Sequence, residues 1–171
     1  FNGDVEGLHT IDPATVGDLR DDDSVQNIVD ETGQEQFVQL NAAAPPFDDV
    51  RARKALALAT PLQNYRDLIG LGIARGADQM VIPESAVATA GVVQQGDDPA
   101  AAAALAAEYC ADVPDGCFDG RINVEFQFPA AGVVGTRQAD ILDAGWSAAF
   151  NVDFDELAQD QHILQTVLGL Y

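Results

Sequence analysis

The residues with the most distinctive chemistry are two cysteines, Cys110 and Cys117, which flank the run Asp-Val-Pro-Asp-Gly. These are turn residues, and they bring the two sulfurs together if Cys110 ends a helix. We expect a disulfide, which implies an oxidising compartment; the alternative is two unpaired thiols, one of them buried at the helix end. No metal site is expected, because there is no second cysteine pair and His9 and His162 are far away in the sequence.

Other stretches partly match known metal-binding, nucleotide-binding or catalytic motifs, but the residues around them do not fit these motifs. Asn151, Asp153 and Asp155 have the first spacings of a calcium loop, but Glu156 stands where glycine is needed and the alternation fits a strand. The glycines of Gly70–Gly76 come close to a dinucleotide fingerprint, but they follow a helical pattern instead of a strand. No Gly-x-Ser-x-Gly motif occurs, and 28 carboxylates make any acid–base pair uninformative. We therefore expect no cofactor and no enzyme, with a hydrolase as the weaker alternative.

The charge of the chain excludes some partners. Among 171 residues, 28 are Asp or Glu and 8 are Lys or Arg, which gives a formal net charge of −20. Such a polyanion repels phosphate backbones and anionic membrane surfaces, so nucleic acid is not an expected partner. The charge has two open interpretations, a high-GC or salt-adapted source and a field that attracts cationic ligands. The 47% of hydrophobic residues predicts a buried core.

The organisation of the chain favours one folded unit. No apolar run approaches the ~20 residues of a membrane span, and the first residues lack the regions of a signal peptide. The chain starts at Phe1 without Met and stops at Tyr171 after an apolar helical pattern. We expect a piece of a longer protein, with residues 1–171 in a single domain.

Several capping signals predict where helices begin. The expected N-terminal residues are Asp12, Asp48 or Asp49, Thr60 in a capping-box pattern, Asp98, Gly135 or Thr136, and Asp160. Gly169 is expected to end the last helix.

Alternating or β-branched stretches predict the strands. They are Val25–Val29 and Gln36–Asn41 around a turn at Glu31–Gln34, a short one at Met80–Ile82 within a long loop, Ile122–Phe128, and Val152–Leu157. The last two strands and the helix between them form a βαβ unit, so the predicted class is α/β.

One stretch resembles a known family. Phe37–Ala59 reads Phe-Val-Gln-Leu-Asn, then Pro-Pro-Phe-Asp-Asp-Val-Arg-Ala-Arg-Lys-Ala, and it is similar to a segment of family 5 extracellular solute-binding proteins, the oligopeptide, dipeptide and nickel receptors of ABC importers. The prolines would stiffen an extended exit and Asp48 would cap the helix.

Segments on both sides of Phe37–Ala59 extend this resemblance over nearly the whole chain. Phe1–Val5, the Asp98-Pro99 helix start and Trp146–Val152 look like further family junctions. Two departures stand out. Thr60-Pro61 replaces the usual Asp-Arg, and the family's next segment, whose acidic residue commonly holds a peptide's amino group, is absent from residues 1–171.

The resemblance implies one lobe of a type II periplasmic-binding-protein fold, a mixed sheet flanked by helices. It implies a monomeric receptor outside the membrane, periplasmic, extracellular or a cell-surface lipoprotein, that captures a peptide or other small solute for ABC permease subunits. The alternative is a secreted protein-interaction domain with the same fold.

The segment after the Ile122 strand is the expected ligand site, because open α/β sheets bind ligands at the carboxyl ends of strands and helix N-termini favour anions. The candidate residues are Phe128, Thr136 and Arg137. Arg137 would pair with a ligand carboxylate, or else form an ordinary surface salt bridge. Trp146 would stack on a ligand, or else belong to the core beside Leu142.

Overall fold

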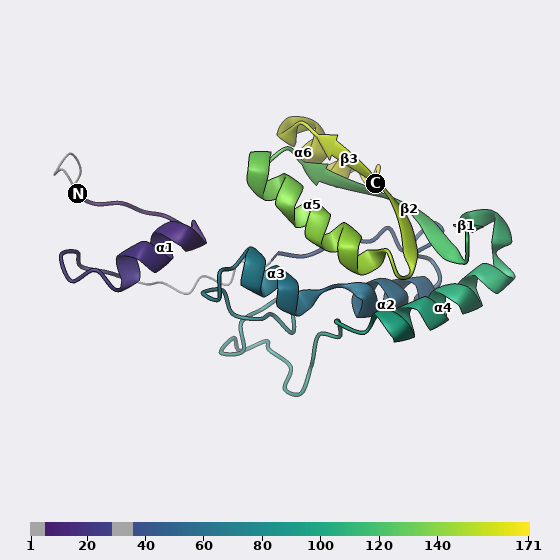
Figure 1. Ribbon diagram of the computed structural model, residues 1–171, viewed down its shortest axis with the longest axis horizontal. Helices are drawn as coiled ribbons and strands as arrows, with labels where there is room; N and C mark the ends of the chain where they lie inside the picture. The colour runs from purple at the N-terminus through teal and green to yellow at the C-terminus, as the bar shows by residue number, and fades with distance from the viewer. Residues whose placement is uncertain (1–5, 29–35) are drawn as a thin grey trace.

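The computed structural model describes residues 6–28 and 36–171. Its helices and strands, in chain order, are α1 (Pro13–Arg20), α2 (Val50–Ala59), α3 (Leu62–Leu68), α4 (Pro99–Asp112), the 3-10 turn η1 (Pro114–Gly116), β1 (Cys117–Phe118), β2 (Arg121–Pro129), α5 (Gly132–Trp146), β3 (Phe150–Leu157) and α6 (Gln159–Leu168). Figure 1 shows their arrangement.

The sheet has the strand order β1-β2-β3 and is mixed. β1 pairs with β2 in an antiparallel hairpin, whereas β2 and β3 run parallel in register from Ile122 opposite Phe150 to Pro129 opposite Leu157. The expected βαβ unit of β2, α5 and β3 is therefore confirmed, with β3 beginning two residues before the predicted start at Val152.

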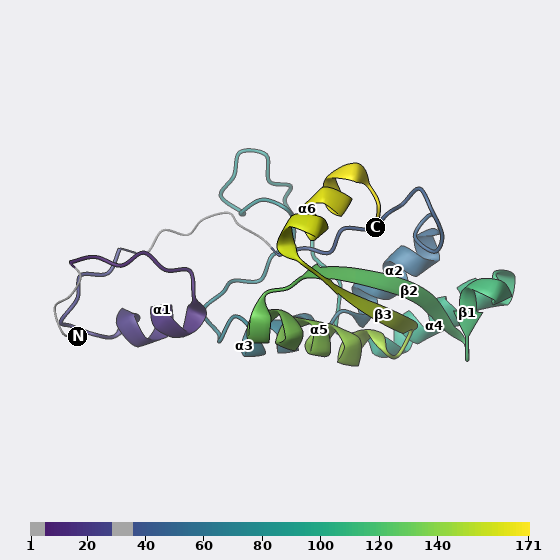
Figure 2. The same ribbon diagram turned by 90° about the horizontal axis from the view of Figure 1, so that it is seen from above.

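One hydrophobic core joins α2, α4 and α5 to one face of the sheet. Trp146, Phe150 and Ile122 are the largest fully buried side chains. Between α2 and α4 the buried residues are mostly alanines, and such small side chains let two helices pack closely. Figure 2 shows α5 on one side of the sheet and α6 on the other, and α6 contributes no buried residue.

Some of the predicted helix N-caps are confirmed by the structure and others are wrong. Asp12 and Asp98 accept a backbone hydrogen bond at the N-caps of α1 and α4, as expected. The cap of α2 is Asp49, whose Oδ1 accepts from the Arg51 amide at 2.7 Å, so the assignment of this role to Asp48 is wrong. Asp160 lies in the first turn of α6, one residue inside a helix that starts earlier than predicted.

The capping box at Thr60 is also wrong. The residue at the N-cap of α3 is Pro61, which makes no side-chain hydrogen bond, and the Thr60 hydroxyl donates to Leu56 O at 2.7 Å at the end of α2. The α3 amide of Gln63 instead faces Asp97, whose carboxylate oxygens lie 3.3 and 3.4 Å away. A residue 34 positions along the chain therefore takes the capping role.

Three predicted strands do not form. Gln36–Asn41, Met80–Ile82 and the described part of Val25–Val29 have no strand pairing, because the structure gives them no neighbouring strand to bond with. The turn at Glu31–Gln34 and the family junction at Phe1–Val5 lie outside the described residues. The long loop between α3 and α4 is as predicted.

The cysteines are joined as the sequence suggests. Cys110 in α4 and Cys117 in β1 form a disulfide with their Cα atoms 5.7 Å apart, and η1 supplies the turn between them. The bond ties the end of α4 to the first strand.

No helix within residues 6–28 and 36–171 combines the length and the apolar character needed to cross a membrane.

Candidate functional site

The segment that follows β2 is shorter than expected, because α5 already begins at Gly132. Gly132 has φ 59°, a left-handed conformation that glycine adopts without strain, and no side chain caps this helix start. Thr136 and Arg137 thus lie in the second turn of α5 and not in a loop. The first-turn amides of α5 keep their capacity to bind an acceptor, and the helix dipole favours a negative charge there.

Phe128 belongs to an aromatic cluster at the carboxyl end of the sheet. Its ring stacks on Phe126 at 6.3 Å between centroids and meets Phe154 edge-on at 6.3 Å. Phe128 is half-buried, so one part of the ring packs and another part stays open to solvent. The cluster holds the ring at the end of β2 beside the start of α5.

Trp146 is a core residue. Only 1% of its surface is exposed, and its ring meets Phe126 edge-on at 5.1 Å between centroids. Its Nε1 donates to the Thr60 hydroxyl at 3.0 Å. The interpretation of Trp146 as core, instead of a stacking platform for a ligand, is confirmed.

Thr136 and Arg137 both project from the exposed part of α5. The Thr136 hydroxyl donates to Gly132 O at 3.2 Å, within its own helix. Among the residues that the structure describes, no carboxylate lies within 4.0 Å of the Arg137 guanidinium. The alternative role of Arg137 in a surface salt bridge is therefore not seen in this part of the chain.

A shallow groove of about 490 Å³ runs between α3 and α5, and Arg137 lines it. Small residues such as Ala144 and Gly145 line it, together with the polar residues Asn64, Asp97, Arg137 and Asp140. Phe128 and Thr136 do not line the groove. The structure thus places Thr136 and Arg137 next to each other in the second turn of α5, with only Arg137 lining the groove, and places Phe128 at the end of β2, four residues before α5 begins.

A hydrogen-bonded node lies beside this groove, between α3 and α5. The Tyr65 hydroxyl donates to Gln36 Oε1 at 2.6 Å, and Gln138 Nε2 donates to the same oxygen at 3.4 Å. Burial raises the pKa of the Tyr65 phenol, so it remains a neutral donor at ordinary pH. Through Gln36, these two bonds connect Tyr65 of α3 with Gln138 of α5.

Asp97 and Asp140 line the groove together with Arg137, but neither is among the site residues predicted from the sequence. Asp97 has φ 57° at the end of a long loop, and no local motif predicts that it returns to α3. Asp140 is three residues after Arg137, a helical spacing that places the two side chains on one side of α5. This spacing is the one signal in the sequence that could have found a groove residue.

Comparison with known proteins gives the family. The model named "Bacterial extracellular solute-binding proteins, family 5 Middle" matches residues 1–162. The chain belongs to this family. A search of curated proteins finds no match.

A solved structure supports the fold of this family 5 chain. NikA from Staphylococcus aureus, crystallised in complex with Ni(L-His)2, matches with a TM-score of 0.52 and 15% sequence identity. The match covers 67% of this chain and 24% of NikA, so the chain spans about a quarter of that protein's length. The expected type II periplasmic-binding-protein fold, with its mixed sheet and flanking helices, is confirmed.

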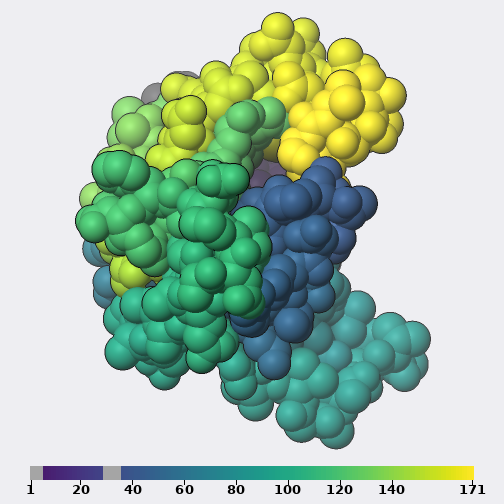
Figure 3. Space-filling view, turned by 90° about the vertical axis from the view of Figure 1, so that its right-hand side faces the viewer, coloured from purple at the N-terminus to yellow at the C-terminus, as the bar shows by residue number. Residues whose placement is uncertain are grey.

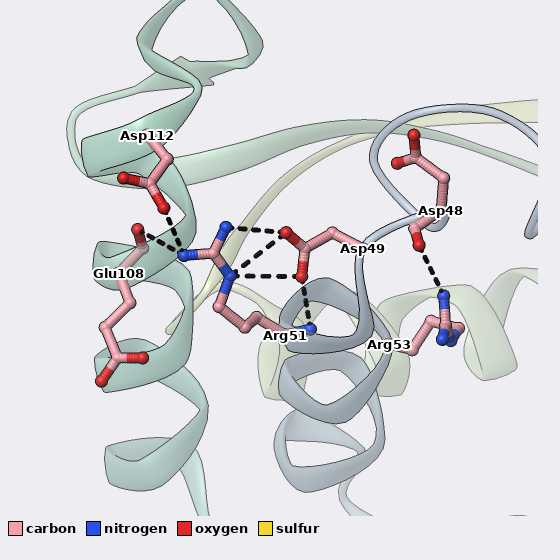
Figure 4. Close-up of polar contacts among 6 residues, drawn as sticks. All are labelled: Asp48, Asp49, Arg51, Arg53, Glu108 and Asp112. Atoms are coloured by element: carbon pink, nitrogen blue, oxygen red, sulfur yellow. Dashed lines mark hydrogen bonds and ion pairs between the residues drawn. The ribbon is translucent and has the colours of Figure 1, made fainter.

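The arginines of the family motif have structural roles in this chain (Figure 4). Arg51 binds Asp49 and Asp112 through its terminal nitrogens, both at 2.7 Å, and thereby links the start of α2 to the end of α4. Arg53 donates to the Phe47 and Asp48 carbonyl oxygens at 2.6 and 3.0 Å. The motif therefore stabilises the entry to α2.

The acidic residues and histidines of the described ranges do not gather into a metal site. No group of three His, Cys, Asp or Glu within residues 6–28 and 36–171 is placed to hold a metal ion. Asn151, Asp153 and Asp155 lie along β3, as the strand interpretation predicts. Family 5 consists of binding proteins, and this membership confirms the expectation that the chain is not an enzyme.

Proposed function

We propose that this chain is part of the solute-binding component of an ABC importer, which captures a peptide or similar small solute outside the membrane and delivers it to permease subunits. The observation that carries the proposal is the family 5 match over residues 1–162. In this proposal residues 1–171 form part of one α/β lobe of a larger, monomeric, two-lobed protein. That protein is located in the periplasm or, as a lipoprotein, on the cell surface.

The proposed contacts lie around the first turns of α5. The uncapped amides at the start of α5 and the Arg137 guanidinium attract a carboxylate of the solute, because both present positive charge to it. Phe128 offers an apolar surface at the end of β2, and Thr136 offers a hydroxyl. The absence of a carboxylate within 4.0 Å of Arg137, in the described part of the chain, supports this role.

Binding of this kind makes and breaks no covalent bond. The solute is held by shape and hydrogen bonds, and closure of two lobes around it excludes water. The contacts described above are therefore half of the proposed site, and the second lobe supplies the other half.

A thermal-shift screen of the full-length protein tests the proposal. A solute that binds only the folded state raises the melting temperature by mass action. The screen uses di- to pentapeptides as the first class, and the Ni(L-His)2 complex that NikA binds as the second class. A saturable rise with a member of either class is expected, with peptides preferred, and no rise with either class contradicts the proposal.

A further inference from the structure

The groove between α3 and α5 has three walls. Along α5 the residues that line it recur at helical spacing, namely Arg137, Asp140, Ile141, Ala144, Gly145 and Ala148. Across from them, α3 lies beside α5 (Figure 1) and contributes Asn64 and Leu68, which are one helical turn apart. The loop between α3 and α4, which projects from the rest of the molecule in Figure 3, contributes Asp97 at its end, and Pro99 follows at the start of α4. A molecule in the groove would therefore contact segments that are distant in the sequence.

The groove carries charges of both signs. Of the described residues that line it, Arg137 is the only cation, whereas Asp97 and Asp140 are anions, and all three are exposed. In the described part of the chain neither carboxylate has a Lys, Arg or His nitrogen within 4.0 Å. Asp97 faces the Gln63 amide at 3.3 and 3.4 Å, but the two oxygens of a carboxylate offer about four acceptor sites. Both carboxylates are therefore available to a cation.

The rest of the groove is mostly apolar. Pro61, Leu68 and Ile141 line it together with alanines, and Leu68 keeps 46% of its surface exposed. A lysine or arginine side chain fits such a surface, because its aliphatic stem lies on apolar groups while its charged end reaches a carboxylate. The net charge of −20 acts in the same direction, since a negative field raises the local concentration of cations.

We propose that the solute carries a basic side chain, which Asp97 and Asp140 bind in the groove while Arg137 and the start of α5 hold the solute's carboxylate. The inference rests on the proposed function, because it names the class of solute for that same site. Asp140 follows Arg137 by three residues, about 4.5 Å along the helix axis, so one basic residue at the carboxyl end of a peptide can contact both. A neutral side chain leaves the two carboxylates without a counter-charge, and an acidic one is repelled by them.

Calorimetric titration of the full-length protein with two matched tripeptides tests the inference. The peptides are alanyl-alanyl-lysine and alanyl-alanyl-norleucine, which share an aliphatic stem and differ in the terminal charge. Asp140→Asn removes one carboxylate of the groove, and Asp143→Asn is the matched control, because Asp143 is exposed on the same helix and does not line the groove. Both variants change the net charge by the same amount, so the comparison isolates the local contact from the long-range field. Asp97→Asn is the second groove variant, and its amide oxygen can still accept from Gln63.

We expect the parent and Asp143→Asn to bind the lysine peptide about ten-fold or more tightly than the norleucine peptide, and this preference to fall to about three-fold or less in Asp140→Asn. The affinity for the norleucine peptide should be the same in all three proteins. Equal affinities of the parent for the two peptides overturn the inference and leave the proposed function standing, as does binding of Ni(L-His)2 by a protein that binds neither peptide. A preference that both Asp140→Asn and Asp97→Asn retain overturns the assignment of the groove. A protein that binds no solute of either class contradicts the proposed function, and the inference with it.

Discussion

Trp146 and Thr60, 86 positions apart in the sequence, are joined by a hydrogen bond from the indole Nε1 to the threonine hydroxyl at 3.0 Å. The same hydroxyl donates to Leu56 O, so one side chain connects the end of α2 to the buried end of α5. Trp146 is 1% exposed, and water therefore cannot replace the threonine as acceptor. This contact sets the position of α5, on which Thr136 and Arg137 lie.

Thr60→Val is expected to destabilise the protein, because it leaves the buried indole N–H without a partner while keeping the side-chain shape. The expected loss in the free energy of unfolding is about 1 to 3 kcal/mol. Thr136→Val, at an exposed position of α5, is the matched control and should stay within about 0.5 kcal/mol of the parent. Urea unfolding measures both, and equal losses in the two variants would refute the role of Thr60.

Gly145→Ala tests the close approach of α5 to the junction of α2 and α3. A Cβ at Gly145 would lie 2.5 Å from Pro61 Cδ and 2.8 Å from Ala59 O. Overpacking of this kind costs about 1 to 3 kcal/mol, which outweighs the gain of about 1 kcal/mol in helix propensity. Asp143→Ala, exposed on the same helix, should be neutral or slightly stabilising. A rise in melting temperature for Gly145→Ala would show that the helices lie farther apart.

The disulfide should contribute measurably to stability. The bond between Cys110 and Cys117 closes a short loop, and the chain-entropy model gives about 2 to 3 kcal/mol for a loop of this size. Replacement of both cysteines by serine should lower the free energy of unfolding by that amount. Alkylation of the parent protein in denaturant without reductant should leave both residues unmodified, and modification of either one would contradict the bond.

The Asp49 carboxylate should make the stability of the fold depend on pH, and the sign of this dependence follows from its lowered pKa. The hydrogen bond from the Arg51 side chain, followed by that from the Arg51 amide, lowers the pKa of Asp49 below its usual range. Its stabilising contribution is therefore present at neutral pH and is lost as the pH falls through the lowered pKa.

The melting temperature of the parent should exceed that of Asp49→Asn at pH 7, and the gap should narrow below about pH 4. In an Arg51→Gln background the gap should depend less on pH, because the side chain that contributes most to the lowered pKa of Asp49 is gone, while the backbone amide remains. A gap that widens on acidification would refute this assignment.

Several parts of the fold could be predicted from local sequence because local chemistry decides them. Asp12 and Asp98 each precede a proline and cap their helices, and the strict alternation of Ile122–Phe128 gives β2. The predicted start of α5 at Gly135 or Thr136 is too late, because the helix begins at Gly132, which has positive φ and no side-chain cap that the sequence could signal. Gln36–Asn41 has strand-forming residues, but pairing depends on a neighbour that the local sequence cannot specify.

The candidate site was less predictable from the sequence because its shape depends on how α3 and α5 pack against each other. The groove beside Arg137 exists where α3 approaches α5, and its acidic rim includes Asp97, which arrives from a loop that has no regular pattern. Thr60 shows the same limit, since the residue that looks like a helix cap is bound instead by a tryptophan from α5. Such contacts between distant segments are set by packing and not by local propensity.

Isothermal titration calorimetry of the full-length protein tests the central claim most directly. The titrant is the peptide or nickel–histidine complex that gives the largest thermal shift, and Arg137→Gln is compared with the parent and with the exposed α1 variant Arg20→Gln. We predict one solute bound per chain, binding about ten-fold or more weaker in Arg137→Gln, and no change in Arg20→Gln. Absence of binding by the parent would contradict the assignment as a solute receptor, and equal affinities in all three proteins would contradict the site on α5.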